Sequence, residues 1–124
     1  MIARQKPLRI KIFYTKQKTV PRYHLLVPRQ FKYLINVTVK HLYLKILNDK
    51  LVFSTKEGEG SRVTLQAYNT HRPIERRSYY FIIDKIIINA FDLLNATITP
   101  LEASKDLVIY GLERQKPRSV ELAQ

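Results

Sequence analysis

Apolar and polar residues alternate in several short segments of this chain, which is the pattern of β-strands with one buried face. In residues 8–14, for example, an apolar residue stands at every second position and Arg9 and Lys11 lie between them. The same pattern predicts the other strands, and a proline ends the second one because proline cannot donate to a strand ladder. The predicted strands are residues 8–14, 23–27, 42–46, 51–54, 62–68, 79–83 and 107–110, with Leu101 in a further closing strand.

Two short helices are predicted between these strands. Residues 29–35 have apolar side chains at the i, i+3 and i+4 spacing of a two-turn helix, and residues 85–94 form a helix about one turn longer. Asp84 immediately precedes the second helix and can accept a hydrogen bond from its first N–H groups. Asn36 and Asn95 follow the helices, and we expect each to adopt the left-handed conformation that closes a helix.

One sequence pattern occurs twice in the chain. Residues 34–42 read L-I-N-V-T-V-K-H-L, and residues 93–101 read L-L-N-A-T-I-T-P-L. Predicted strands flank both copies in the same order, so chance similarity is the weaker explanation. We therefore expect two half-size repeats, residues 9–55 and 62–110, which form a single domain with pseudo-twofold symmetry.

The remaining segments connect or flank these repeats. Residues 56–61 contain two of the three glycines and are expected to be the linker. Residues 1–8 are expected to form a loose basic arm. Residues 111–124 are mostly polar and are expected to form a C-terminal tail.

The charge of the chain is strongly positive and unevenly distributed. The net charge is +12 at pH 7, and the isoelectric point is near 10.1. Residues 1–50 contain twelve Lys or Arg and one acidic residue, whereas residues 51–124 contain ten basic and nine acidic residues. Such an excess indicates a polyanionic partner, and nucleic acid is the leading one. A membrane is not expected, because the chain has neither a long basic amphipathic helix nor an apolar run of about 18 residues.

Nothing in the sequence favours catalysis. The chain has no cysteine, which excludes disulfides, thiolate metal sites and cysteine nucleophiles. His24, His41 and His71 do not have the spacing of metal ligands, and the chain lacks a glycine-rich phosphate-binding motif. We therefore expect no enzymatic activity, no metal and no cofactor. The basic first residues do not have the pattern of a secretory signal, so a cytoplasmic location is expected.

Residues 24–37 and the predicted hairpin over residues 42–53 show a family resemblance. A strand ending in Val-Pro, a short basic helix and a β-hairpin follow one another, and this order resembles the SpoVT/AbrB-like swapped-hairpin DNA-binding family in its tandem-repeat, MraZ-like arrangement. The match departs from the family where Asn36-Val37 replaces Gly-Ile/Val and where Asp84 replaces the second proline. The resemblance implies an α+β fold of two tandem βαββ-like swapped-hairpin units. It also implies a sequence-specific transcription regulator that binds double-stranded DNA.

Phosphate contacts require Lys or Arg at loop tips and helix starts. The loop 15–22 and the loop 69–78 are both basic and are expected to form two fingers. Arg22 and Arg76 are the best candidates for reading bases, because a guanidinium can donate to two acceptors of one base. The resemblance implies further contacts at Lys32 and at His24, which stands where the family has Arg. The predicted nucleic-acid-binding residues are Lys16, Lys18, Arg22, His24, Arg29, Lys32, Arg72, Arg76 and Arg77.

Two other classes of protein explain the charge as well. One is a basic RNA-binding assembly protein of ribosomal type, and the other is a non-specific genome-coating protein. Tyrosines near the basic segments suit stacking on single-stranded bases, although core-lining strand residues are the favoured interpretation. A homodimer remains open. These tyrosines are Tyr23, Tyr33, Tyr79 and Tyr80.

Overall fold

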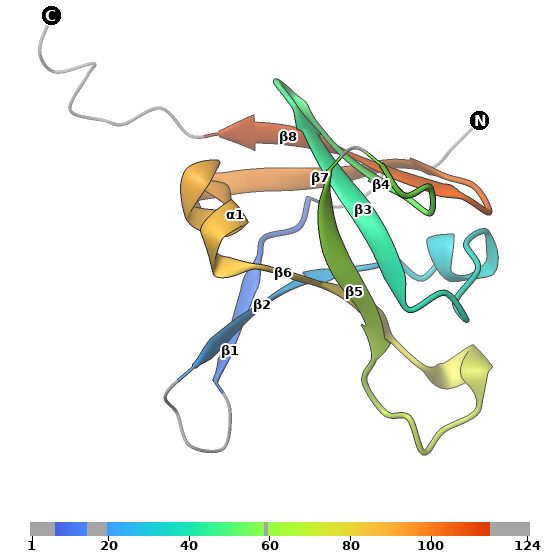
Figure 1. Ribbon diagram of the computed structural model, residues 1–124. Coiled ribbons are helices and arrows are strands. Elements are labelled where there is room, and N and C mark those ends of the chain that lie inside the picture. The colour runs from blue at the N-terminus through green and yellow to red at the C-terminus, as the bar shows by residue number, and fades with distance from the viewer. Residues whose placement is uncertain (1–6, 15–19, 59, 115–124) are drawn as a thin grey trace, which may run out of the picture.

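The computed structural model describes residues 7–14, 20–58 and 60–114, which form a strand-rich half-barrel (Figure 1). Its eight strands lie in the order β1-β2-β6-β5-β3-β4-β8-β7, and all neighbours are antiparallel. The strands are β1 (Lys11–Tyr14), β2 (Pro21–Leu26), β3 (His41–Leu47), β4 (Lys50–Ser54), β5 (Ser61–Ala67), β6 (Tyr79–Ile83), β7 (Ala96–Ala103) and β8 (Leu107–Arg114). The helical elements are α1 (Lys85–Ala90) and the 3₁₀ turns η1 (Phe31–Tyr33), η2 (Ile74–Arg76) and η3 (Leu93–Asn95). The expectation of a small β-rich domain with short helices is confirmed.

The same order of elements occurs twice along the chain. Two strands, a helical segment and two further strands make up β1–β4, and β5–β8 follow the same series with the extra turn η2 between β5 and β6. Strand pairs from the two halves alternate across the sheet, so that β1-β2 is followed by β6-β5, then β3-β4, then β8-β7. In the pairing of β2 with β6, Leu25 lies opposite Phe81, and these two residues hold corresponding positions in their halves.

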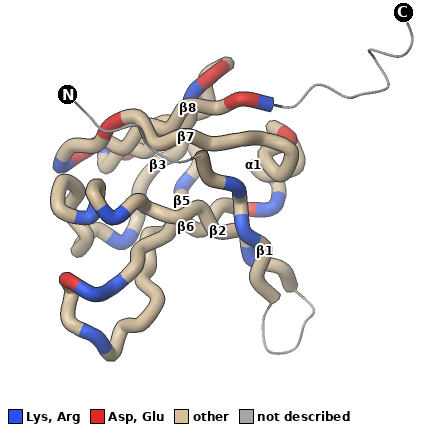
Figure 2. Tube along the Cα trace, turned by 180° about the vertical axis from the view of Figure 1, so that it is seen from behind, with Lys and Arg blue, Asp and Glu red and all other residues tan. Residues whose placement is uncertain are grey.

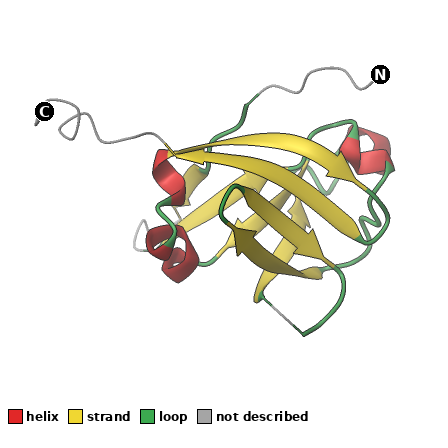
Figure 3. Cartoon of the chain, turned by 90° about the horizontal axis from the view of Figure 1, so that it is seen from above, coloured by secondary structure: helices red, strands yellow, loops and turns green. Residues whose placement is uncertain are grey.

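The two edges of the sheet approach one another at one point. Leu8 N donates a hydrogen bond to Ile98 O at 2.6 Å, and Ile98 N donates to Leu8 O at 2.8 Å. This bridge corresponds to the pairing of Leu42 with Val63 between β3 and β5. Figure 3 shows the result from above, with strands on opposite sides of the half-barrel crossing at an angle. Leu8 is therefore part of the fold and not of a loose arm.

Alternate residues of the strands point into one apolar interior. Phe53 and Phe81 stack with their ring centroids 4.0 Å apart, and the Tyr110 ring meets Phe53 edge-on at 5.6 Å. All three side chains are fully buried. Burial raises the pKa of Tyr110, so its hydroxyl stays protonated and donates to Leu26 O at 3.0 Å. This hydrogen bond links β8 to β2 across the interior.

The helices are shorter than the sequence pattern predicts. The helix expected over residues 29–35 is only the turn η1, and the helix expected over residues 85–94 ends at Ala90. It ends there because Asp92 is left-handed, with φ of 52°. Asp84 does cap α1, since its side chain accepts a hydrogen bond from Ile86 N at 3.1 Å.

The two asparagines do not close helices in the left-handed conformation. The non-glycine residues with positive φ among the described residues are Asn69 and Asp92, so Asn36 and Asn95 are excluded. The Asn36 side chain instead accepts hydrogen bonds from the backbone and the hydroxyl of Thr38. Asn has this alternative because its short side chain bonds readily to the backbone two residues on.

One strand is longer than the sequence pattern predicts, since the pattern indicated a closing strand only at Leu101. Ala96–Ala103 forms β7 although it contains Pro100, which breaks most strands. β7 lies at the end of the sheet order, where a missing N–H is tolerated. The repeated motif therefore occupies different positions in its two copies: residues 37–40 precede a strand, and residues 96–99 lie inside one. Residues 111–114, expected in the tail, extend β8.

Gly60 occupies a position that no other residue fits well. Its φ is 117°, and a Cβ atom there would lie 2.6 Å from Leu44 O, whereas Gly58 has φ of 144° and open space around it. We expect Gly58→Ala to lower the free energy of unfolding by about 1 kcal/mol through backbone strain alone. Gly60→Ala is expected to cost about 2 kcal/mol more, because the backbone of β3 must also shift. Urea unfolding of both variants measures the difference, and equal losses would contradict the close approach.

Candidate nucleic-acid interface

Two hairpins project from the same side of the half-barrel (Figure 1). The first finger is the hairpin of β1 and β2, whose described part ends at Tyr14 and resumes at Val20. The second finger is the segment 68–78 between β5 and β6, closed at its base by a hydrogen bond from Tyr68 N to Ser78 O at 2.8 Å. Lys16 and Lys18, two of the predicted contacts, lie outside the described residues.

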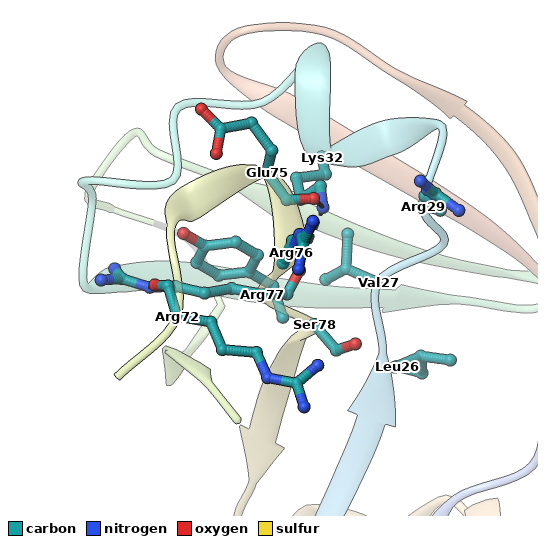
Figure 4. A pocket seen from close by; sticks show the side chains of 10 residues that line it. Leu26, Val27, Arg29, Lys32, Arg72, Glu75, Arg76, Arg77 and Ser78 are labelled. Carbon is teal, nitrogen blue, oxygen red and sulfur yellow. Dashed lines mark hydrogen bonds between the residues drawn. The ribbon is translucent and has the colours of Figure 1, made fainter. Parts of the chain in front are cut away.

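A hollow of about 350 Å³ lies between the second finger and the segment that follows β2 (Figure 4). Its lining combines basic residues from both halves of the chain, which the sequence separates by about 40 positions. The hollow therefore unites the predicted contacts Arg29, Lys32, Arg72, Arg76 and Arg77. The remaining lining residues are Leu26, Val27, Glu75, Ser78 and Tyr79.

Two of these basic side chains bind the protein itself. Lys32 is only 8% exposed, and its Nζ donates to Glu75 O at 2.5 Å and to Arg77 O at 3.1 Å. Arg77 donates from Nε to Arg72 O at 2.8 Å and from Nη2 to Thr70 O at 3.0 Å. Both residues thus fix the shape of the second finger.

The other three arginines of the hollow are available to a ligand. Arg29, Arg72 and Arg76 are exposed, and their side chains form no hydrogen bond or ion pair with another residue in the described ranges. Glu75 is close in sequence, but Figure 4 shows its carboxylate directed away from the Arg29 and Arg76 guanidinium groups. Three planar guanidinium groups without an internal counterion favour the binding of phosphate, which accepts two parallel hydrogen bonds from each.

Arg22 lies at the opposite end of β2 from Arg29. Its backbone pairs with Phe13 of β1, and its side chain is exposed. It lines a second hollow of about 380 Å³, together with Lys85 and Asp84 at the start of α1. The structure therefore brings Arg22 to the first finger but does not bring it together with the arginines of the second.

An aromatic cluster joins the bases of the two fingers. It consists of Phe13, His24, Tyr68 and Tyr80, which come from β1, β2, the position directly after β5, and β6. Phe13 stacks on His24 at 4.4 Å and 25°, and Tyr68 stacks on Tyr80 at 4.1 Å and 27°, so the two halves contribute matching pairs. His24 also stacks on Tyr80 at 4.1 Å. Phe13 and Tyr68 were not predicted as site residues, although both flank the basic loops in the sequence.

His24 is part of this cluster and is 5% exposed. Its Nδ1 lies 2.9 Å from the Tyr68 hydroxyl, while its Nε2 is buried and has no hydrogen-bond partner among the described residues. Burial, together with the nearby positive charge of Arg22, lowers the pKa of His24 from 6.5 to about 4. The ring is therefore neutral at pH 7, and its buried position leaves it no room to bind phosphate.

The strands that form the two fingers contain no acidic residue. β1, β2, β5 and β6 contribute Lys11, Arg22 and Arg62 but neither Asp nor Glu. Figure 2 shows basic residues along β1 and on the second finger. A ligand at the fingers thus meets a mainly positive surface. Glu75 is the acidic residue of the second finger.

The described residues contain no group of three or more His, Cys, Asp or Glu that could hold a metal ion. Among the same residues, no helix has the length and apolar character needed to cross a membrane. No protein-family model, curated protein or solved structure matches the chain.

The low pKa of His24 predicts a pH dependence of stability. The unfolded chain takes up a proton on His24 near pH 6.5, whereas the folded protein resists protonation until about pH 4. The contribution of neutral His24 is complete above pH 6.5 and is lost as the pH falls toward 4. We expect His24→Phe to flatten the fall in unfolding free energy over this range, as measured by urea titration at several pH values. Parallel curves for both proteins would contradict a buried neutral imidazole.

Proposed function

We propose that the protein is a sequence-specific transcription regulator that binds double-stranded DNA with its two fingers. The observation that carries the proposal is the set of Arg29, Arg72 and Arg76, exposed around one hollow and free of internal partners. Phosphate contacts of this kind fix a protein on the duplex, and guanidinium groups at a loop tip can also read guanine in the major groove.

The strand order supports the AbrB-like, swapped-hairpin part of this proposal. In a swapped arrangement, the hairpins of one unit are inserted between those of the other, so the units cannot be separated without breaking strand pairs. The alternation of β1-β2, β6-β5, β3-β4 and β8-β7 has this property. We infer a duplicated swapped-hairpin unit, with its pseudo-twofold axis near the pairing of Leu25 with Phe81.

A pseudo-twofold arrangement of two fingers favours a duplex partner. Binding sites for such proteins contain two related half-sites, because the symmetry of the DNA backbone matches that of the protein. The aromatic cluster supports this role, since it joins the bases of both fingers and so limits changes in their separation.

Structured RNA is the second candidate partner. Tyr14 at the first finger and Tyr33 in η1 are 63% and 66% exposed, and each lies close to basic residues in the chain. Exposed aromatic rings beside cations stack on unpaired bases, which RNA loops supply. Competition between a duplex and a hairpin RNA of equal length distinguishes the two partners. Equal binding of both would favour a non-specific genome-coating protein instead.

The salt dependence of binding tests the role of the hollow. For duplex DNA, affinity falls as salt rises, and each phosphate contact adds about 0.9 to the magnitude of the slope of log affinity against log salt. We expect Arg29→Ala, Arg72→Ala and Arg76→Ala each to reduce the slope by up to about 0.9, since each removes one phosphate contact. Fluorescence anisotropy with a labelled duplex at several salt concentrations measures this.

The matched controls are Lys50→Ala and Lys105→Ala, which remove the same charge from exposed positions in the hairpins β3–β4 and β7–β8. These controls should leave the slope within about 0.2 of the wild-type value, since long-range effects are screened. If the controls and the arginine variants reduce the slope equally, binding does not depend on the hollow.

A further inference from the structure

We infer that Lys32 is a positioning residue, which orients Arg76 for the nucleic acid without contacting a phosphate. The inference deepens the proposed function and rests on it for the affinity measurement. The sequence and the family resemblance both predict that Lys32 contacts the nucleic acid directly. A positioning role instead would assign the phosphate contacts of the site to other residues.

The contacts of Lys32 leave its ammonium group little to offer a ligand. The side chain is 8% exposed, and two of its N–H donors are used by Glu75 O and Arg77 O. The ammonium also lies 5.4 Å from the centroid of the Tyr33 ring. Both hydrogen bonds are charge-assisted and therefore stronger than bonds between neutral groups.

The two carbonyls that Lys32 binds belong to the residues on either side of Arg76. Glu75 lies inside η2, and Arg77 directly follows η2 in an extended conformation. Because Lys32 binds the carbonyl groups of both Glu75 and Arg77, it restricts the backbone of Arg76 and hence the direction of the Arg76 side chain. Arg77 stabilises the same segment from its other side through Arg72 O and Thr70 O.

The hydrogen bonds of Lys32 to Glu75 O and Arg77 O join distant parts of the chain, and the second half has no lysine at the corresponding position. Lys32 follows Pro28 by four positions, and the residue four positions after Asp84 is Ile88, which is 1% exposed and apolar. The corresponding position of the second half thus packs into the core instead of anchoring a finger. The second finger is therefore ordered before it meets a ligand, which lowers the entropy lost on binding.

Two measurements on the full chain separate positioning from contact. The variants are Lys32→Met, which keeps the aliphatic stem and removes the ammonium, and Lys50→Met as the control with the same charge change. The first measurement is amide hydrogen exchange of residues 70–78 without nucleic acid. The second is duplex affinity as a function of salt. Arg76→Ala serves as the reference for a direct contact.

We expect Lys32→Met to speed amide exchange in residues 70–78 about tenfold or more, and Lys50→Met to leave it unchanged. Duplex affinity should fall roughly tenfold for Lys32→Met, because a loosened finger must be ordered on binding. The salt slope should stay at the wild-type value, whereas Arg76→Ala lowers it by up to about 0.9. A Lys32→Met slope as low as that of Arg76→Ala, with unchanged exchange, would overturn the inference.

Rapid amide exchange throughout the core would show that Lys32→Met has unfolded. A second variant keeps the test decisive in that case. Arg77→Met removes the side-chain hydrogen bonds to Arg72 O and Thr70 O and should give the same local exchange and the same unchanged slope. If the wild-type protein binds no nucleic acid, the proposed function fails, but the exchange of residues 70–78 still shows whether Lys32 holds the finger.

Discussion

The pairing of β2 with β6 is the contact on which the rest of the structure depends. It joins the two halves of the chain near their centres and places Leu25 opposite Phe81, both fully buried. On the inner face, Phe81 stacks on Phe53, and Phe53 contacts the ring of Tyr110. The Tyr110 hydroxyl donates a hydrogen bond to Leu26 O of β2. Because neither half contains a complete sheet, this interior forms only when both halves fold together.

The outer face of the same strand pair determines where the fingers lie. His24 and Tyr80 alternate with Leu25 and Phe81, and they stack on Phe13 and Tyr68 at the bases of the two fingers. The position of the fingers is thus built into the sheet, and Lys32 and Arg77 fix the shape of the second one. What remains for a partner is the cationic surface of Arg29, Arg72 and Arg76, which the fold holds in place without neutralising it.

Local patterns in the sequence predicted most strands, because alternation follows directly from having one buried face. Local patterns failed where tertiary contacts determine the bounds of an element. Pro100 lies in an edge strand, and Asp92 interrupts a helix that the apolar periodicity extends to Leu94. The basic residues around the hollow were predicted from charge, and Lys32 also from the family resemblance. Charge did not distinguish Lys32, which the fold buries, from Arg76, which it exposes, because burial depends on a finger some 40 residues away.

We propose that the two fingers bind a duplex with two related half-sites. Selection from random duplex DNA at about 150 mM salt tests it most directly, since non-specific binding is weak at that ionic strength. We expect an enriched motif with two similar halves, and we expect the combined Arg29→Ala, Arg72→Ala and Arg76→Ala variant to lose this enrichment. Absence of any enriched motif, with tighter binding to structured RNA than to duplex, would contradict it.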